Sequence, residues 1–177
     1  MLNKRPKRTK YSKYQKGRIN SNLPVNKSNL FQKNLENKDF RYLLIAMEPL
    51  RLTASHIAAG ELAIKRELNI KFKSSNLSIT DIEGNKINIK GDYNLHVFPH
   101  LPVTKKPAEV RMGKGKGSID YWMTRIRIGS PIFELKFKNA NINNNKNIQI
   151  RCFNIAKQIF DVVNSKLGIK TKIVKVS

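Results

Sequence analysis

Between residues 39 and 69 the apolar positions follow two patterns, first that of a strand and then that of a helix. The run "DFRYLLIAM" (39–47) is almost continuously apolar, as in a buried strand, and Glu48-Pro49 ends it. Beyond it, Thr53 is a suitable N-cap, and apolar or small residues recur at helical spacing at Ile57, Gly60, Ile64 and Leu68. We therefore expect a buried strand over 39–47 and a helix over roughly 54–69.

Alternation of apolar and polar positions dominates residues 70–98 and predicts strands. Apolar residues alternate on both sides of a turn at 83–85, as in a hairpin, at Leu77, Ile79, Ile87 and Ile89. The stretch "YNLHVF" (93–98) predicts a further strand. After it, a helix is excluded and the chain is kept extended by Pro99, Pro102 and Pro107.

The C-terminal third predicts two more strands, a second helix and a closing strand. Residues 119–129 alternate as a strand, and residues 132–138 would return beside them as a hairpin partner. From Ile148 the period becomes helical, with one apolar face that holds Cys152, Ile155, Ile159, Val163 and Leu167. Gly168 would stop this helix, and residues 169–176 predict a strand. The predicted class is α+β, with two helices packed on a mainly antiparallel sheet.

Length and the distribution of acids indicate one domain with a basic extension. The chain has 177 residues, of which 40% are hydrophobic, and this supports one modest core. Glu36 is the first acidic residue. We expect a basic N-terminal arm over 1–38 and a single domain over 39–177.

The charge balance narrows the class of partner. Thirty-five Lys and Arg residues stand against 12 Asp and Glu, a formal net charge of +23. Such a balance costs self-repulsion unless a polyanion is present, and nucleic acid is the commonest polyanion. An anionic membrane surface is the rival, although no apolar run approaches the length that crosses a bilayer and no signal peptide follows the start.

The arm itself favours RNA. The stretch "KRPKRTKYSKYQKGR" (4–18) carries eight cations, and Tyr11 and Tyr14 are interleaved with them. Aromatic rings stack on bases and cations meet phosphates, so this composition suits an RNA-binding arm. A solubilising tail and a mitochondrial transit peptide are the alternatives, but the stretch lacks an amphipathic apolar stripe.

The loop "RMGKGKG" (111–117) alternates glycines and cations without an acidic partner. It fits neither the phosphate loop of nucleotide-hydrolysing enzymes nor the dinucleotide fingerprint, because Gly117 and Ser118 stand where those patterns need other residues. A backbone without Cβ atoms can approach a polyanion closely. We expect a polyanion-binding loop, and a surface hairpin without a partner is the alternative.

No catalytic or metal-binding pattern emerges from the rest of the sequence. Cys152 is the only cysteine and lies on the apolar helix face, and the three histidines have no zinc spacing. Tyr121 and Trp122 are neighbours on a strand, so they should face opposite sides, one in the core and one toward the loop or RNA. We expect no enzyme activity, no cofactor and no metal.

Several blocks resemble the large-subunit ribosomal protein sixteen family of bacteria and organelles. The most specific is "KKPAEVRMGKGKG" (105–117) before an aromatic strand, and "PKRTKYSKYQKGR" (6–18) is similar to the family's opening segment. Shorter blocks follow the family's order at "RLTASHIA", "HVFPHLPVT" and "KLGIKTK". The resemblance spans nearly the whole chain.

The resemblance implies an α+β domain that binds large-subunit ribosomal RNA and neighbouring ribosomal proteins. It places the glycine-rich loop on the aminoacyl-tRNA side, near the peptidyl-transferase centre. The implied loop contacts are Arg111, Met112, Gly113, Lys114, Gly115, Lys116 and Gly117. The implied ribosomal RNA contacts are Lys7, Arg8, Lys10, Lys13, Lys16 and Arg18 in the arm and Lys65 and Arg66 on the first helix.

The chain departs from the family in ways that bear on its origin. The first helix is poorer in arginine, and residues 71–90 and 139–147 look like insertions. Asn and Ile occur twenty times each, which we interpret as the mark of an AT-rich genome. We expect a mitochondrial ribosome, with a bacterial or plastid one as the alternative. A basic protein that binds RNA or a membrane surface outside the ribosome is the competing function.

Overall fold

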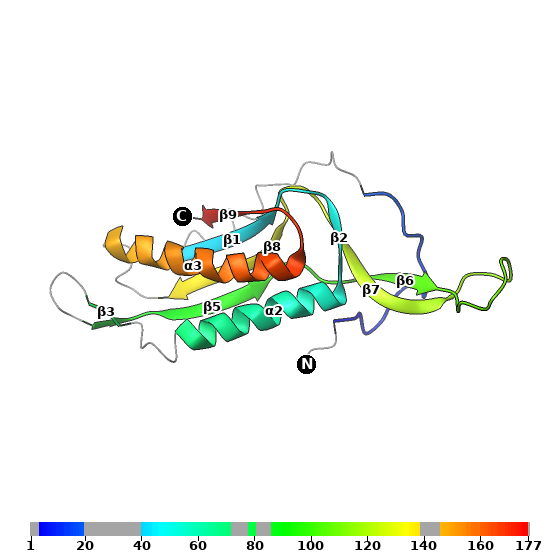
Figure 1. Ribbon diagram of the computed structural model, residues 1–177, viewed down its shortest axis with the longest axis horizontal. Helices are drawn as coiled ribbons and strands as arrows, with labels where there is room; N and C mark the ends of the chain where they lie inside the picture. The colour runs from blue at the N-terminus through cyan, green and yellow to red at the C-terminus, as the bar shows by residue number, and fades with distance from the viewer. Residues whose placement is uncertain (1–3, 20–39, 72–77, 81–85, 139–145, 177) are drawn as a thin grey trace.

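A computed structural model describes residues 4–19, 40–71, 78–80, 86–138 and 146–176. The molecule is elongated, with helices and a sheet at one end and a projecting hairpin at the other (Figure 1). The main sheet has the order β5-β8-β1-β9, and all its pairings are antiparallel. Its strands are β1 (Phe40–Ala46), β5 (Lys90–Leu95), β8 (Pro131–Lys138) and β9 (Thr171–Val176).

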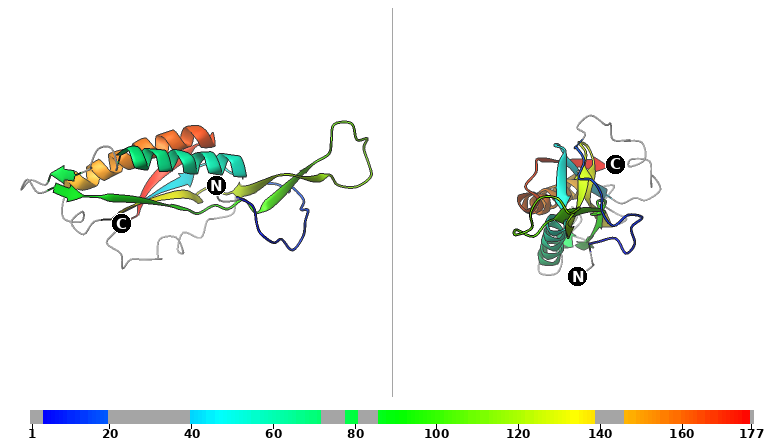
Figure 2. Two further views of the ribbon diagram at one scale, coloured as in Figure 1. Left: turned by 90° about the horizontal axis from the view of Figure 1, so that it is seen from below. Right: turned by 90° about the vertical axis from the view of Figure 1, so that its right-hand side faces the viewer.

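Both helices cover one face of this sheet, as Figure 2 shows. They are α2 (Ala54–Asn69) and α3 (Lys146–Leu167), and each buries its apolar stripe. At their crossing with the sheet, a Cβ on Gly60 would lie 3.1 Å from the ring of Phe133, so a small residue is favoured there. The predicted α+β fold, with two helices on a mainly antiparallel sheet, is confirmed.

The local signals at the helix ends are confirmed as well. Helix α2 starts after Thr53, whose hydroxyl accepts a hydrogen bond from the His56 amide. Helix α3 starts at Lys146, two residues before the predicted Ile148, and Gly168 follows its last residue with φ of 64°. Cys152 is fully buried, and burial raises the pKa of its thiol to about 11, as expected for a core thiol.

A second sheet builds the projecting hairpin. It has the order β2-β7-β6, from strands β2 (Leu50–Thr53), β6 (Leu101–Lys105) and β7 (Ser118–Ile126). Within the proline-rich stretch, the extended chain that was expected includes the strand β6, but residues 107–110 form a turn, in which the Val110 amide donates to the carbonyl of Pro107 (3.3 Å). Strands β3 (Ser78–Thr80) and β4 (Lys86–Asn88) pair as the expected hairpin, and its turn lies outside the described residues.

The prediction that residues 132–138 pair with residues 119–129 is wrong. Strand β8 pairs with β1 and β5, whereas β7 pairs with β2 and β6. At the corner, Gly129 takes φ of 79°, and its amide donates to the carbonyl of Ala46 (2.7 Å). This corner directs the chain from one sheet into the other instead of folding it back on itself.

Two smaller expectations are also corrected. Strand β5 covers Lys90–Leu95 and ends before the "HVF" that was assigned to it. Neither Tyr121 nor Trp122 belongs to the core, since Tyr121 is 39% exposed and Trp122 is half-buried. The boundary expected at residues 38–39, and most of 139–147, lie outside the described residues.

Candidate nucleic-acid interface

The glycine loop is the tip of the hairpin formed by β6 and β7. Lys105 pairs with Ser118 at the end of the ladder, so residues 106–117 project beyond the sheet. A Cβ on Gly117 would lie 2.3 Å from the carbonyl oxygen of Lys105, so only glycine fits where the two strands close.

The backbone of the loop is left-handed over three consecutive residues. Gly113, Lys114 and Gly115 have φ of 93°, 53° and 83°. No atom lies within 4 Å of a Cβ built on Gly113 or Gly115, so a side chain would have room there. Glycine is favoured at these two positions because of the positive φ. The Lys106 ammonium donates to the carbonyl of Gly113 and ties this turn to the base of the loop.

The tip of the loop is open to solvent. Met112 is 98% exposed, and the neighbouring Arg111 and Lys114 are exposed too. The side chains of Arg111 and Lys114 form no ion pair or hydrogen bond with any described residue. Lys116 differs, because its ammonium donates to the carbonyl of Tyr14 in the arm. The loop therefore offers two unopposed cations and one that joins it to the arm.

Arginines of the second sheet hold the arm through its backbone. Arg125 Nη2 donates to the carbonyl of Lys16 (2.7 Å), and Arg51 Nη2 donates to that of Gly17 (2.6 Å). Arg51 and Arg125 are direct cross-strand partners on β2 and β7, a pairing of like charges that costs stability by itself. The arm carbonyls between them offset this repulsion, because each accepts a hydrogen bond from a guanidinium.

This mode of attachment leaves most of the arm cations exposed to solvent. Lys13 donates to the carbonyl of Lys116 (2.7 Å), which closes the contact between arm and loop from the other side. The remaining predicted arm residues are exposed and make no ion pair with described residues: Lys7, Arg8, Lys10, Lys16 and Arg18. Tyr11 and Tyr14 pack edge to face, with ring centroids 5.8 Å apart.

Glu61 anchors the start of the arm on α2. Its carboxylate pairs with Lys4 and with Lys65 (3.1 Å), and it accepts a hydrogen bond from the Tyr93 hydroxyl (2.9 Å). Burial raises the pKa of Glu61, but the hydrogen bonds from these three groups outweigh it and lower the pKa to about 2. The carboxylate is therefore charged at neutral pH.

The two cations expected on the first helix have different surroundings. Lys65 is engaged with Glu61, and hydrogen bonds with Tyr93 and Glu61 raise its pKa. Its side chain is still 47% exposed. Arg66 is exposed and pairs with no described residue. The arm joins the other two parts: Lys4 at its start contacts Glu61 of α2, and Lys13 further along contacts the loop.

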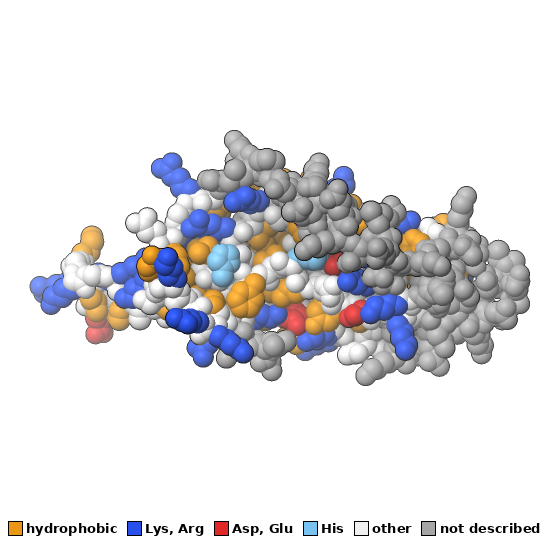
Figure 3. All heavy atoms as spheres, turned by 180° about the vertical axis from the view of Figure 1, so that it is seen from behind, with side chains coloured by type: hydrophobic (Ala, Val, Ile, Leu, Met, Phe, Trp, Pro, Cys, Tyr) orange, Lys and Arg blue, Asp and Glu red, His pale blue; other side chains and the backbone are white. Residues whose placement is uncertain are grey.

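Lys and Arg side chains outnumber carboxylates at the hairpin end of the molecule (Figure 3). The surface that we call the basic interface consists of the exposed arm cations and the loop cations: Lys7, Arg8, Lys10, Lys13, Lys16, Arg18, Arg111, Lys114 and Lys116. Sequence reasoning missed the groups that assemble it, namely Arg51, Arg125 and Glu61. No charge pattern in the sequence singles them out, and only the strand register reveals that the two arginines are opposite each other.

The described part of the chain contains neither a metal-ligand cluster nor a membrane-spanning helix. Its residues contain no cluster of three or more His, Cys, Asp or Glu that could hold a metal. None of its helices is long and apolar enough to cross a membrane.

Comparison with known proteins agrees with the resemblance seen in the sequence. The family described as ribosomal protein L16p/L10e matches residues 6–174. The large ribosomal subunit protein uL16 of Zymomonas mobilis is 36% identical over 169 residues, which cover 96% of this chain and 90% of that protein. The uL16 proteins of Mesorhizobium japonicum and Paracoccus denitrificans are 40% and 38% identical, over 73% and 77% of this chain and 75% and 80% of their own lengths. The chain belongs to the ribosomal protein L16p/L10e family.

Proposed function

We propose that this chain is a structural, non-enzymatic constituent of the large ribosomal subunit. It binds large-subunit ribosomal RNA through the arm and contacts tRNA through the glycine loop, on the aminoacyl side near the peptidyl-transferase centre. Family membership supports the ribosomal role, since the relatives are large ribosomal subunit proteins. The observation that carries the RNA contacts is the basic interface, where exposed cations face solvent from a backbone already tied to the sheet.

The way the arm is held explains how it would bind. The guanidiniums of Arg51 and Arg125 donate to arm carbonyls, so the backbone of the arm is held while most of its cationic side chains stay exposed. An arm that is placed before binding loses less conformational entropy when it meets RNA than an unrestrained tail does. Neighbouring ribosomal proteins and ribosomal RNA would complete the surroundings of this surface.

The loop tip is the part best suited to a mobile partner such as tRNA. Arg111 and Lys114 are exposed and unopposed, and the left-handed turn over residues 113–115 allows a close approach of the backbone to phosphates. A ligand that arrives and leaves needs such a protruding contact, whereas ribosomal RNA needs the broader surface of the arm.

A loop variant and a control variant test whether the loop contacts tRNA while the arm binds ribosomal RNA. We expect the double variant Arg111→Ala, Lys114→Ala to assemble into large subunits normally and to weaken aminoacyl-tRNA binding by about tenfold. The matched control removes one exposed arginine and one exposed lysine of α3, Arg151→Ala with Lys157→Ala, and should leave both measurements unchanged. Filter binding of aminoacyl-tRNA to reconstituted ribosomes provides the readout. Wild-type tRNA binding by the double variant would contradict the role of the loop.

We further propose that the ribosome in question is mitochondrial, on the basis of the Asn and Ile bias. Fractionation of the source cells would place the protein in mitochondrial ribosomal particles on a sucrose gradient. Recovery in bacterial or plastid ribosomes would contradict the mitochondrial assignment alone. Recovery on membranes, insensitive to ribonuclease, would contradict the ribosomal function itself.

A further inference from the structure

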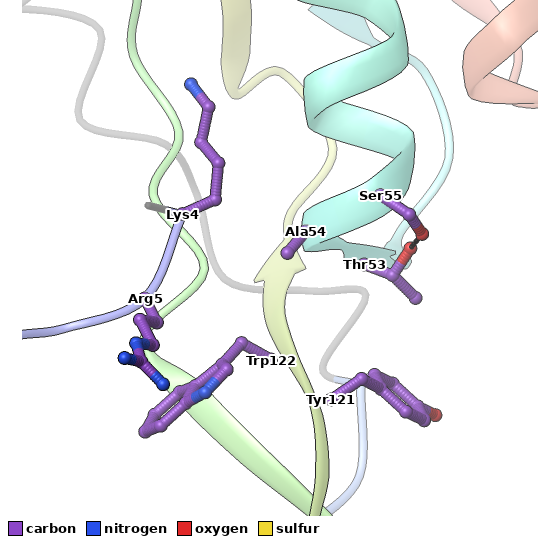
Figure 4. Close-up of a pocket in the computed structure, with 7 residues that line it drawn as sticks. All are labelled: Lys4, Arg5, Thr53, Ala54, Ser55, Tyr121 and Trp122. Atoms are coloured by element: carbon purple, nitrogen blue, oxygen red, sulfur yellow. Dashed lines mark hydrogen bonds between the residues drawn. The ribbon is translucent and has the colours of Figure 1, made fainter. Parts of the chain in front are cut away.

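A hollow lies between the first described residues of the arm and the strand β7. A cavity of about 500 Å³ is lined by Arg5 of the arm, by Tyr121 and Trp122 of β7, and by Thr53 and Ser55 where α2 begins (Figure 4). A second cavity of about 970 Å³ shares Arg5 and Trp122 with the first. These two side chains therefore border both cavities.

The pair consists of the two planar groups that stack best on nucleobases. Both side chains line the hollow, Arg5 from the arm and Trp122 from β7 (Figure 4). Trp122 is half-buried and stays outside the core, so part of its ring remains available. Aromatic rings and guanidinium planes both stack on unpaired bases.

Of the two cations that line the smaller cavity, Lys4 and Arg5, only Arg5 is free to contact a ligand. Its side chain forms no ion pair or hydrogen bond with any described residue. The adjacent Lys4, by contrast, is committed to Glu61, and Figure 4 shows its side chain pointing away from Trp122. The smaller cavity has no carboxylate among its lining residues, whereas Asp120 lines the larger one, so a phosphate is better placed in the smaller cavity.

Size restricts the ligand further. Sites for small molecules occupy about 300–1,000 Å³, so the smaller cavity can take one nucleotide but not a base-paired duplex. Thr53 and Ser55, whose hydroxyls lie 2.7 Å apart, add polar groups to the lining of the same cavity. The site combines a stacking surface, a cation and hydroxyls, as a nucleotide requires.

We propose that this hollow binds one unpaired nucleotide of the ribosomal RNA, with its base stacked on Trp122 and its phosphate neutralised by Arg5. The inference rests on the proposed function and names the part of the RNA that the start of the arm recognises. It adds a base-stacking site to an interface that otherwise offers cations to phosphates.

Fluorescence tests this directly, because Trp122 is the only tryptophan of the chain. The probes are a single-stranded RNA of about 12 nucleotides, within the span of such sites, and a blunt duplex with the same number of phosphates. We expect both probes to bind, as followed by anisotropy of a labelled RNA. Only the single strand should quench the tryptophan emission.

Matched variants separate stacking from charge. Arg5→Ala should weaken the binding reported by quenching about tenfold, whereas Arg8→Ala, which removes the same charge from the same arm, should weaken it about threefold or less. Followed by anisotropy, Trp122→Phe should keep the affinity for the single strand within about threefold, and Trp122→Leu should lose about tenfold.

The inference is overturned if the duplex quenches as strongly as the single strand, or if Arg5→Ala and Arg8→Ala behave alike. It is also overturned if intact tRNA quenches the emission while single-stranded fragments of ribosomal RNA do not. If neither probe binds by anisotropy, the proposed function fails as well. If both bind and the emission stays constant, only the nucleotide site fails.

Discussion

Glu61 shows how one carboxylate can place a positively charged arm. Three groups from three segments converge on it, namely Lys4 of the arm, Lys65 one turn along α2 and Tyr93 of β5. Its side chain is only 10% exposed, so the charge stays paired within the protein. An isolated buried carboxylate would be costly, and these donors turn it into an attachment point.

Glu61 should make stability depend on pH in a defined acidic window. Because its pKa in the folded protein is about 2, below the usual 4.5, its contribution is full above about pH 4.5 and is lost as the pH falls toward 2. We expect the wild type to lose on the order of 2 kcal/mol more than Glu61→Gln between pH 5 and about pH 2.5. Urea unfolding at a series of pH values measures the difference.

The lowered pKa of Glu134 does not interfere with this comparison. Burial raises the pKa of that carboxyl, but a hydrogen bond with His96 and the nearby positive charge of Lys136 outweigh it. Both proteins keep Glu134, so its contribution cancels in the difference. Parallel pH profiles for the wild type and Glu61→Gln would show that Glu61 does not hold the arm.

At the scale of elements, local signals were readable from the sequence and distant pairings were not. Helix α2 was predicted to its end residues because the Thr53 cap and the apolar period lie within the helix itself. Strand β8 was located, but its partner was wrong, because two strands joined by a short turn usually pair and here the Gly129 corner separates them.

In the candidate site, too, the residues with a local sequence pattern were predicted and those brought together by distant pairing were not. The arm cations and the loop glycines stand out in the sequence because they are concentrated in two short stretches. The arginine pair of β2 and β7 became visible only with the strand register, since Arg51 and Arg125 are 74 positions apart and meet across the ladder. The Arg5–Trp122 hollow likewise needs the arm's path across β7, which no local pattern specifies.

Removing one arginine of the Arg51–Arg125 pair should release the arm without unfolding the sheet. Arg125→Met loses the hydrogen bonds to the carbonyls of Gln15 and Lys16 but also relieves the repulsion with Arg51. We expect trypsin to cleave the arm about fivefold faster, while the free energy of unfolding changes by less than about 1 kcal/mol.

The control for this experiment is Arg127→Met, which removes an exposed arginine just beyond the end of β7. It should leave both the cleavage rate and the stability unchanged. Equal cleavage of the arm in Arg125→Met and in the wild type would mean that the arm is held by other contacts.

At the scale of the whole molecule, the two ends differ in structure: one contains the hydrophobic core and the other carries the projecting hairpin. The main sheet and its helices hold almost all of the buried apolar side chains, and the second sheet projects the hairpin away from them (Figure 1). The cations of the basic interface are therefore presented at the end of a folded support. Such an architecture would suit the RNA binding proposed above.

The salt dependence of binding to large-subunit ribosomal RNA tests this claim most directly. If the basic interface neutralises ~8 phosphates, the logarithm of the association constant should fall against the logarithm of salt concentration with a slope of about −7. Filter binding over a range of salt concentrations gives the slope. We predict a value near −7, and a slope of about −1 or shallower would contradict the account.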